Sequence, residues 1–107
     1  MKAYYIGSYS PAGLKGVAEQ GYIGRKEAVD KLAAIMGMEV LDMTYTRGQF
    51  DVIVTVEAPD EETALGAFIA IKSSGGFDNV VLLTELDLDG VLSHTQKAAP
   101  SYKVPNS

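Results

Sequence analysis

The stretch from residue 38 to residue 57 constrains the fold more than any other part of the sequence. Two runs rich in β-branched and apolar residues, 38–46 and 50–57, flank a short turn at 47–49. Side chains alternate between the two faces of a strand, so a hairpin sorts its residues into two sets. With Thr44 opposite Ile53, one face receives an almost wholly apolar set, which predicts the core: Leu41, Met43, Tyr45, Phe50, Val52, Val54 and Val56.

The opposite face of this hairpin is mixed in character and holds three carboxylates. It receives Asp42, Thr44, Thr46, Asp51, Ile53, Thr55 and Glu57. Such a set is too polar for an ordinary dry core. It predicts a solvated surface, a polar-lined cleft or the rim of an interface between two sheets.

The order of elements predicts an α+β fold. A tyrosine-rich strand at 3–9 precedes an amphipathic helix at 25–36, with Ala28, Val29, Leu32, Ile35 and Met36 on its apolar side. After the hairpin, Asp60 begins a second helix that ends near residue 74, and its apolar side holds Ala64, Leu65, Phe68 and Ile71. A last strand covers 77–86. The resulting β-α-β-β-α-β order is ferredoxin-like, an antiparallel sheet with two helices on one face. Ser10 and Pro11 suit the start of a short turn or weak helix, and four glycines make 13–24 the loosest predicted stretch.

Length and charge restrict the classes of protein. With 107 residues the chain predicts a single domain, 1–107, with its core in 1–86 and a C-terminal helix near 90–98 followed by a polar tail. A net charge of −5 argues against nucleic acid as a partner. No apolar run is long enough to span a membrane, and the N-terminus lacks a signal-peptide pattern. The absence of cysteine excludes disulfides and thiolate metal sites, and we expect a cytoplasmic protein.

Several short motifs resemble those of one known family. Residues 48–60 (GQFDVIVTVEAPD) resemble the signature of the GYD domain family, in which glycine, an acidic residue, tyrosine and aspartate precede a hydrophobic strand. Residues 9–15 (YSPAGLK) are similar to the family's opening, 25–29 (RKEAV) to its first helix and 97–105 (KAAPSYKVP) to its ending. The resemblance therefore covers nearly the whole chain.

This resemblance implies a ferredoxin-like fold and the dimeric α/β-barrel assembly, in which two sheets face each other around a shared interior. The family carries no settled activity. The sequence also departs from the family pattern, since Gln49 replaces the usual acidic residue, Phe50 the tyrosine and Thr44 a common aromatic residue. A family site that used the tyrosine hydroxyl would be missing here.

The polar hairpin face supplies the candidate site. We predict ligand contacts from Tyr9, Asp42, Thr44, Asp51, Thr55 and Glu57, with Asp51 as the candidate for a catalytic role. Clustered carboxylates bind hard cations or raise one another's pKa, but they also serve as solvated or ion-paired surface groups. We predict no metal site and no cofactor. A tyrosine of the first strand, Tyr5 or Tyr9, is expected to form a pocket wall on this face.

Two further features carry weaker signals. His94 is the single histidine and is expected near the surface of the C-terminal helix, where it is a candidate base or an ordinary surface group. Residues 21–26 (GYIGRK) precede a helix and suggest either an anion-binding loop or a flexible loop with two surface cations.

These features predict a homodimeric, or higher homo-oligomeric, binding or structural module with no assignable reaction, which takes at most a small-molecule ligand. The first alternative is a cofactor-free isomerase or monooxygenase whose barrel interior is lined by Asp51, Thr44, Thr55 and a tyrosine of the first strand. A second is a regulatory or partner-binding subunit that uses its acidic surface and its tail. The sequence alone does not separate these three.

Overall fold

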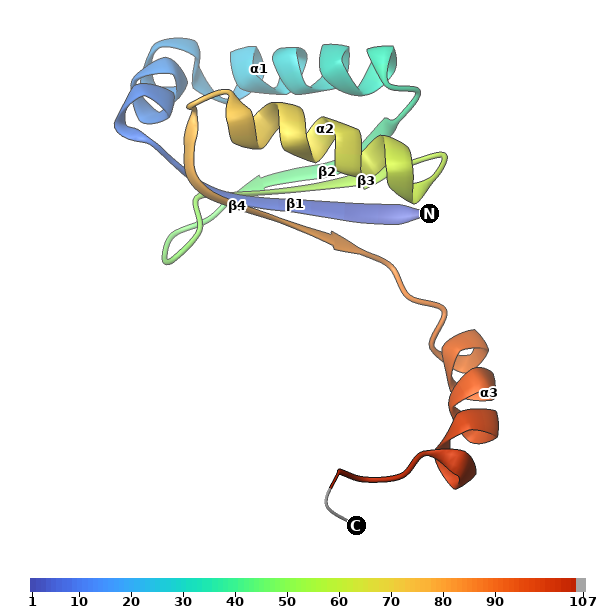
Figure 1. The fold of residues 1–107 in the computed structure, drawn as a ribbon. Helices are drawn as coiled ribbons and strands as arrows, with labels where there is room; N and C mark the ends of the chain where they lie inside the picture. The colour runs from blue at the N-terminus through green and yellow to red at the C-terminus, as the bar shows by residue number, and fades with distance from the viewer. Residues whose placement is uncertain (106–107) are drawn as a thin grey trace.

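The fold is an α+β arrangement in the order β-α-β-β-α-β, followed by a C-terminal helix (Figure 1). A computed structural model describes residues 1–105, so the last two residues of the predicted tail lie outside the described part. The elements are β1 (Lys2–Tyr9), α1 (Pro11–Ile35), β2 (Glu39–Tyr45), β3 (Val52–Glu57), α2 (Glu61–Ser73), β4 (Phe77–Thr84), α3 (Leu88–Ala98) and a 3₁₀ helix (Ala99–Ser101).

The four strands form one antiparallel sheet in the order β2-β3-β1-β4. Helices α1 and α2 both lie on one face of it (Figure 1), which confirms the predicted ferredoxin-like fold. The hairpin register is also as predicted, with Thr44 opposite Ile53. None of the helices within residues 1–105 has the length and apolar composition needed to cross a membrane.

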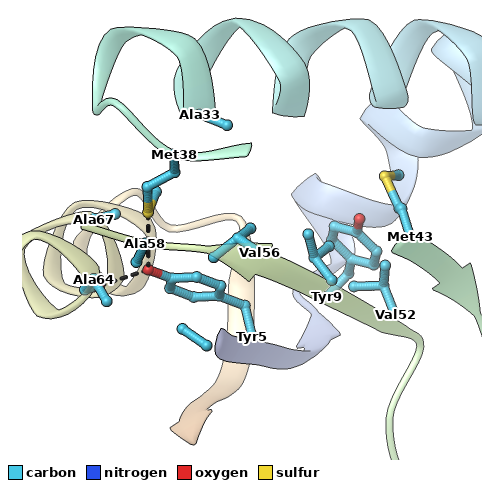
Figure 2. Close-up of a cluster of buried hydrophobic side chains, with 12 residues drawn as sticks. Tyr5, Tyr9, Ala33, Met38, Met43, Val52, Val56, Ala58, Ala64 and Ala67 are labelled. Carbon is cyan, nitrogen blue, oxygen red and sulfur yellow. Dashed lines mark hydrogen bonds between the residues drawn. The ribbon is translucent and has the colours of Figure 1, made fainter. Parts of the chain in front are cut away.

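The core lies between the sheet and the two helices (Figure 2). Met43, Val52, Val54 and Val56 are buried there, as the alternation predicted. From β1, the hydroxyl of Tyr5 donates a 2.6 Å hydrogen bond to the carbonyl oxygen of Ala64 on α2. This bond satisfies a buried hydroxyl and fixes α2 above the central strand.

Some predicted core positions are wrong. Leu41 is 46% exposed, because the β2–β3 register shifts between Val40 and Asp42 and leaves an extra residue at a bulge. On the helices, Ile35 and Leu65 are exposed, whereas the small side chains of Ala33 and Ala67 face the sheet and are buried. Helical spacing alone favoured the larger side chains, but close approach to the sheet selects the smaller ones.

The predicted loose stretch at 13–24 is also wrong, because α1 begins at Pro11. The Ser10 hydroxyl accepts a hydrogen bond from the backbone N–H of Gly13 and caps the helix. The helix bends at Gly21, whose φ of 68° is non-helical. Glycine is needed at position 13 of the helix, because the absence of a side chain leaves room for the carbonyl oxygen of Gly76. Tertiary approach thus outweighs the low helix propensity of glycine.

Helix α3 stands apart from this body. It extends from β4 on the side of the sheet opposite α1 and α2 (Figure 1). The radius of gyration is 17.7 Å, whereas a compact domain of this length has about 13 Å. The helix begins two residues earlier than predicted, because the Asp87 carboxylate accepts a hydrogen bond from the Gly90 N–H. An apolar strip remains uncovered on it, formed by Leu88, Val91 and Leu92.

Two glycines of α1 provide a matched test of this packing. Gly13→Ala is expected to lower the free energy of unfolding by about 1–3 kcal/mol, because the methyl group would collide with the Gly76 carbonyl oxygen. Gly16→Ala is the control, since nothing lies within 4 Å of the added methyl group. That change is expected to raise the free energy of unfolding by roughly 0.5–1 kcal/mol. Urea unfolding measures both, and equal effects of the two variants would contradict the packing.

Candidate functional site

The sheet face opposite α1 and α2, called here the free face, is organised in rows of cross-strand neighbours. Tyr4 of β1 lies between Thr55 of β3 and Leu83 of β4. In the next row, Ile6 lies between Ile53 and Val81. These two rows bring together an apolar cluster in the middle of the free face, which we call the central cluster: Tyr4, Ile6, Ile53, Val81 and Leu83.

Polar residues surround the central cluster on three sides. On β2 the neighbours are Asp42, opposite Thr55, and Thr44, opposite Ile53. At one end of the strands, Glu57 lies opposite Lys2, and at the other end Ser8 lies opposite Asn79. An apolar centre with a polar border is the composition of a protein interface rather than of a solvated surface.

The structure brings only some of the predicted site residues together. Asp42 and Thr44 are in contact, with the Thr44 hydroxyl donating to the Asp42 carboxylate at 2.7 Å, and Thr55 is the cross-strand neighbour of Asp42. Asp51 directly precedes β3 and Glu57 ends it, so the two are six residues apart, which corresponds to roughly 20 Å. The Glu57 carboxylate instead pairs with the amino group of Met1 at 3.0 Å.

Asp51 fixes the hairpin loop to β1. The pairing of β1 with β3 ends at Gly7, opposite Val52, so Tyr9 lies beyond this ladder. The Asp51 carboxylate accepts a 2.9 Å hydrogen bond from the Tyr9 N–H, and the Ser8 hydroxyl donates to the carbonyl oxygen of Gln49 at 2.6 Å. This geometry gives Asp51 a structural task; a ligand contact by it stays a prediction.

The predicted pocket wall on the free face is corrected. Tyr5 and Tyr9 point toward the helices, and it is Tyr4 that faces the other way. Successive residues of β1 alternate between the two faces, and aromatic or apolar residues occur on both. The sequence therefore did not show which of the two faces is buried under the helices. Tyr9 is visible beside Met43 and Val52 in Figure 2, on the helix side of the sheet.

On that side Tyr9 belongs to an aromatic group. Its hydroxyl is hydrogen-bonded to the Tyr45 hydroxyl at 3.0 Å, and its ring stacks on Phe77 with the centroids 4.5 Å apart. Tyr22 packs edge-on against Tyr45 and donates to the carbonyl oxygen of Met43 at 2.9 Å. Burial, and then the bond to Tyr45, raise the pKa of Tyr9 above its usual range. The Tyr9 phenol therefore stays protonated at neutral pH.

The sequence suggested Arg25 only as one cation of an anion-binding loop or a flexible loop at 21–26, and the expected loop is wrong. Residues 21–26 do not form a loop; they lie within α1 at and just after its bend. This bend places Arg25 between two cavities on the helix side of the sheet, one of about 130 Å³ and one of about 240 Å³. The G-x-x-G pattern was the only signal, and it pointed to a loop.

The remaining candidates occupy separate places. His94 lies exposed on α3, as predicted. Among residues 1–105, no three histidine or carboxylate side chains gather closely enough to hold a metal ion.

Comparison with known proteins gives one match. Residues 5–90 match the family model described as GYD domain. No curated protein and no solved structure matches the chain. The matched region holds Gly48 and Asp51, and both have a clear task here. Gly48 has a φ of 135°, a backbone conformation that favours glycine in the turn, and Asp51 binds the Tyr9 N–H.

The structural role of Asp51 is testable. Asp51→Ala is expected to lower the free energy of unfolding by about 1–3 kcal/mol, because the Tyr9 N–H loses its acceptor in a partly buried place. Asp51→Asn should keep most of the stability, since the amide oxygen still accepts this bond. Asp78→Ala, at an exposed carboxylate of β4, is the control. Thermal or urea unfolding that gives Asp51→Ala the stability of the control would refute the role.

Proposed function

Because the chain belongs to the GYD domain family, we propose that it is a homodimeric binding or structural module whose free face packs against that of a second copy. The observation that carries this proposal is the central cluster. Five apolar residues share one face of the sheet by their register, and helices α1 and α2 both lie on the other face (Figure 1). Antiparallel sheets covered on one side only otherwise carry polar residues on the other.

The arrangement of the free face suits a two-fold axis. Such an axis brings the same patch of both copies together, so the apolar rows meet and exclude water. The polar residues Asp42, Thr44 and Thr55 follow the β2 side of the cluster. In the proposed dimer they line the space between the sheets, where a small-molecule ligand would meet them. That ligand contact, and the enzymatic alternative that depends on it, stay predictions.

Helix α3 supports the same dimer. It lies on the side of the sheet where the second copy would sit (Figure 1). An isolated helix of this length is marginal in water without packing. We infer that its uncovered strip, formed by Leu88, Val91 and Leu92, packs on the second copy.

The size of the interface also favours a contribution from α3. At about 4.8 Å between strands and 3.3 Å per residue, the sheet face covers roughly 450 Å² in plan. Stable interfaces bury about 800 Å² on each partner. A helix that reaches around the second copy would supply part of the difference. The cysteine-free sequence suits a reducing compartment, and we infer the cytoplasm as its location.

A charged substitution in the centre of the free face tests the proposed dimer interface. Ile6→Asp is expected to convert a dimer to a monomer at micromolar concentration, because an unpaired carboxylate would be buried between two apolar rows. Ile35→Asp is the matched control, since Ile35 is 83% exposed on α1. Light scattering coupled to size-exclusion chromatography measures the mass. A monomeric unaltered protein, or an Ile6→Asp dimer, would contradict the proposed interface.

The contribution of α3 is tested separately. The double variant Leu88→Asp, Leu92→Asp is expected to raise the dimer dissociation constant at least tenfold while the far-ultraviolet spectrum of the body is kept. Ser93→Asp is the control, because the exposed Ser93 lies on the other side of the same helix from this strip. Sedimentation equilibrium measures the dissociation constants. Unchanged association of the double variant would remove α3 from the interface but leave the sheet contact standing.

A further inference from the structure

The space between the helices and the sheet is incompletely filled. Within residues 1–105, no large side chain is fully buried, and small residues occupy central places under the helices. A half-open cavity of about 130 Å³ remains there, lined mainly by apolar side chains of β1, α1, β3, α2 and β4, among them Leu32, Val54, Ala67, Ile71 and Phe77. A cavity of about 150 Å³ in another protein stays dry and holds one benzene molecule.

Arg25 stands at the border of this cavity. Its side chain lines both the 130 Å³ cavity and the neighbouring one of about 240 Å³, and Phe77 is likewise shared. The Nε atom is buried and has no hydrogen-bond partner within the described residues. The Nη1 atom donates to the side-chain oxygen of Gln20 at 3.2 Å, a neutral acceptor.

The charge of Arg25 is therefore not balanced locally. Among residues 1–105, the ion pairs involve Met1 and Lys26 but not Arg25. A half-buried guanidinium normally pairs with a carboxylate or phosphate, because burial of an unpaired charge is costly. The arrangement thus favours an anion beside Arg25.

A second donor lies nearby. Tyr9 lines the larger cavity together with Arg25, and the positive charge of Arg25 acts on the Tyr9 phenol. The Tyr9 and Tyr45 hydroxyls share one hydrogen bond, so one of the two protons in the pair remains free for another acceptor. A cation at the border of the apolar cavity and a phenol in the neighbouring cavity thus lie close to each other.

We propose that this cavity binds a small carboxylate with an apolar, preferably aromatic, body. The carboxylate pairs with Arg25 and the Tyr9–Tyr45 hydroxyls, and the body occupies the space between α1, α2 and the sheet. The volume admits one six-membered ring. The site lies on the opposite side of the sheet from the free face, so it does not depend on the proposed dimer.

The test uses sodium benzoate as the probe and the full chain labelled with ¹⁵N. Benzoate should cause saturable shifts of the backbone amides of Val54, Ala67 and Ile71, with a dissociation constant on the order of a millimolar. Benzamide, which has the same shape without the charge, should bind at least tenfold more weakly. Acetate, which has the charge without the ring, should also bind at least tenfold more weakly than benzoate. Shifts that map instead to Tyr4 and Ile53 would locate binding on the free face and overturn the proposal.

A variant pair isolates the guanidinium. Arg25→Gln is expected to weaken benzoate roughly tenfold to a hundredfold, the range for a lost hydrogen bond to a charged group. Lys31→Gln removes an exposed cation from the same helix and should leave the affinity unchanged. If Arg25→Gln does not fold, the comparison of benzoate with benzamide on the unaltered protein decides. Equal affinity for these two probes, no saturable shift with benzoate, or unaltered benzoate affinity in a folded Arg25→Gln would each refute the site.

Discussion

The structure depends on the alternation of side chains along β1, the central strand between β3 and β4. Its residues Ala3, Tyr5, Gly7 and Tyr9 are buried under the helices, while Tyr4, Ile6 and Ser8 face the other way. Both faces of one strand thus carry apolar residues. Only one face is covered by the chain itself, and this imbalance sets the two questions that the molecule raises: what covers the free face, and what fills the space under the helices.

The sequence predicted those parts of the fold in which successive residues of a strand differ clearly in polarity or size. In β3, valines alternate with polar or larger residues, so the core face and the register with β2 followed directly. In β1 there is no such contrast, and Tyr9 was therefore assigned to the wrong face. The prediction for Leu41 was wrong for a different reason. A bulge adds one residue to β2, and alternation along a strand gives no sign of where such an extra residue interrupts it.

The same reasoning explains the limits on the candidate site. Asp51, Asp42 and Glu57 share a face by alternation, but alternation fixes the face and not the distance. Each carboxylate has its own local partner, the Tyr9 N–H, the Thr44 hydroxyl and the Met1 amino group. The place of Arg25 between two cavities could not be predicted, because it depends on the bend of α1 at Gly21. Such a bend inside a helix leaves no periodic trace in the sequence beyond the glycine itself.

The small residues of the core link these observations. Ala33, Ala64 and Ala67 let the helices approach the sheet closely, but they bury little apolar surface of their own. A domain of about 100 residues has only a narrow margin of stability, so each uncovered apolar region matters. A second copy on the free face, and a carboxylate with an apolar body in the cavity, would each bury apolar surface that the single chain leaves uncovered. Because both add to the folded state alone, each would stabilise the same sheet from its own side.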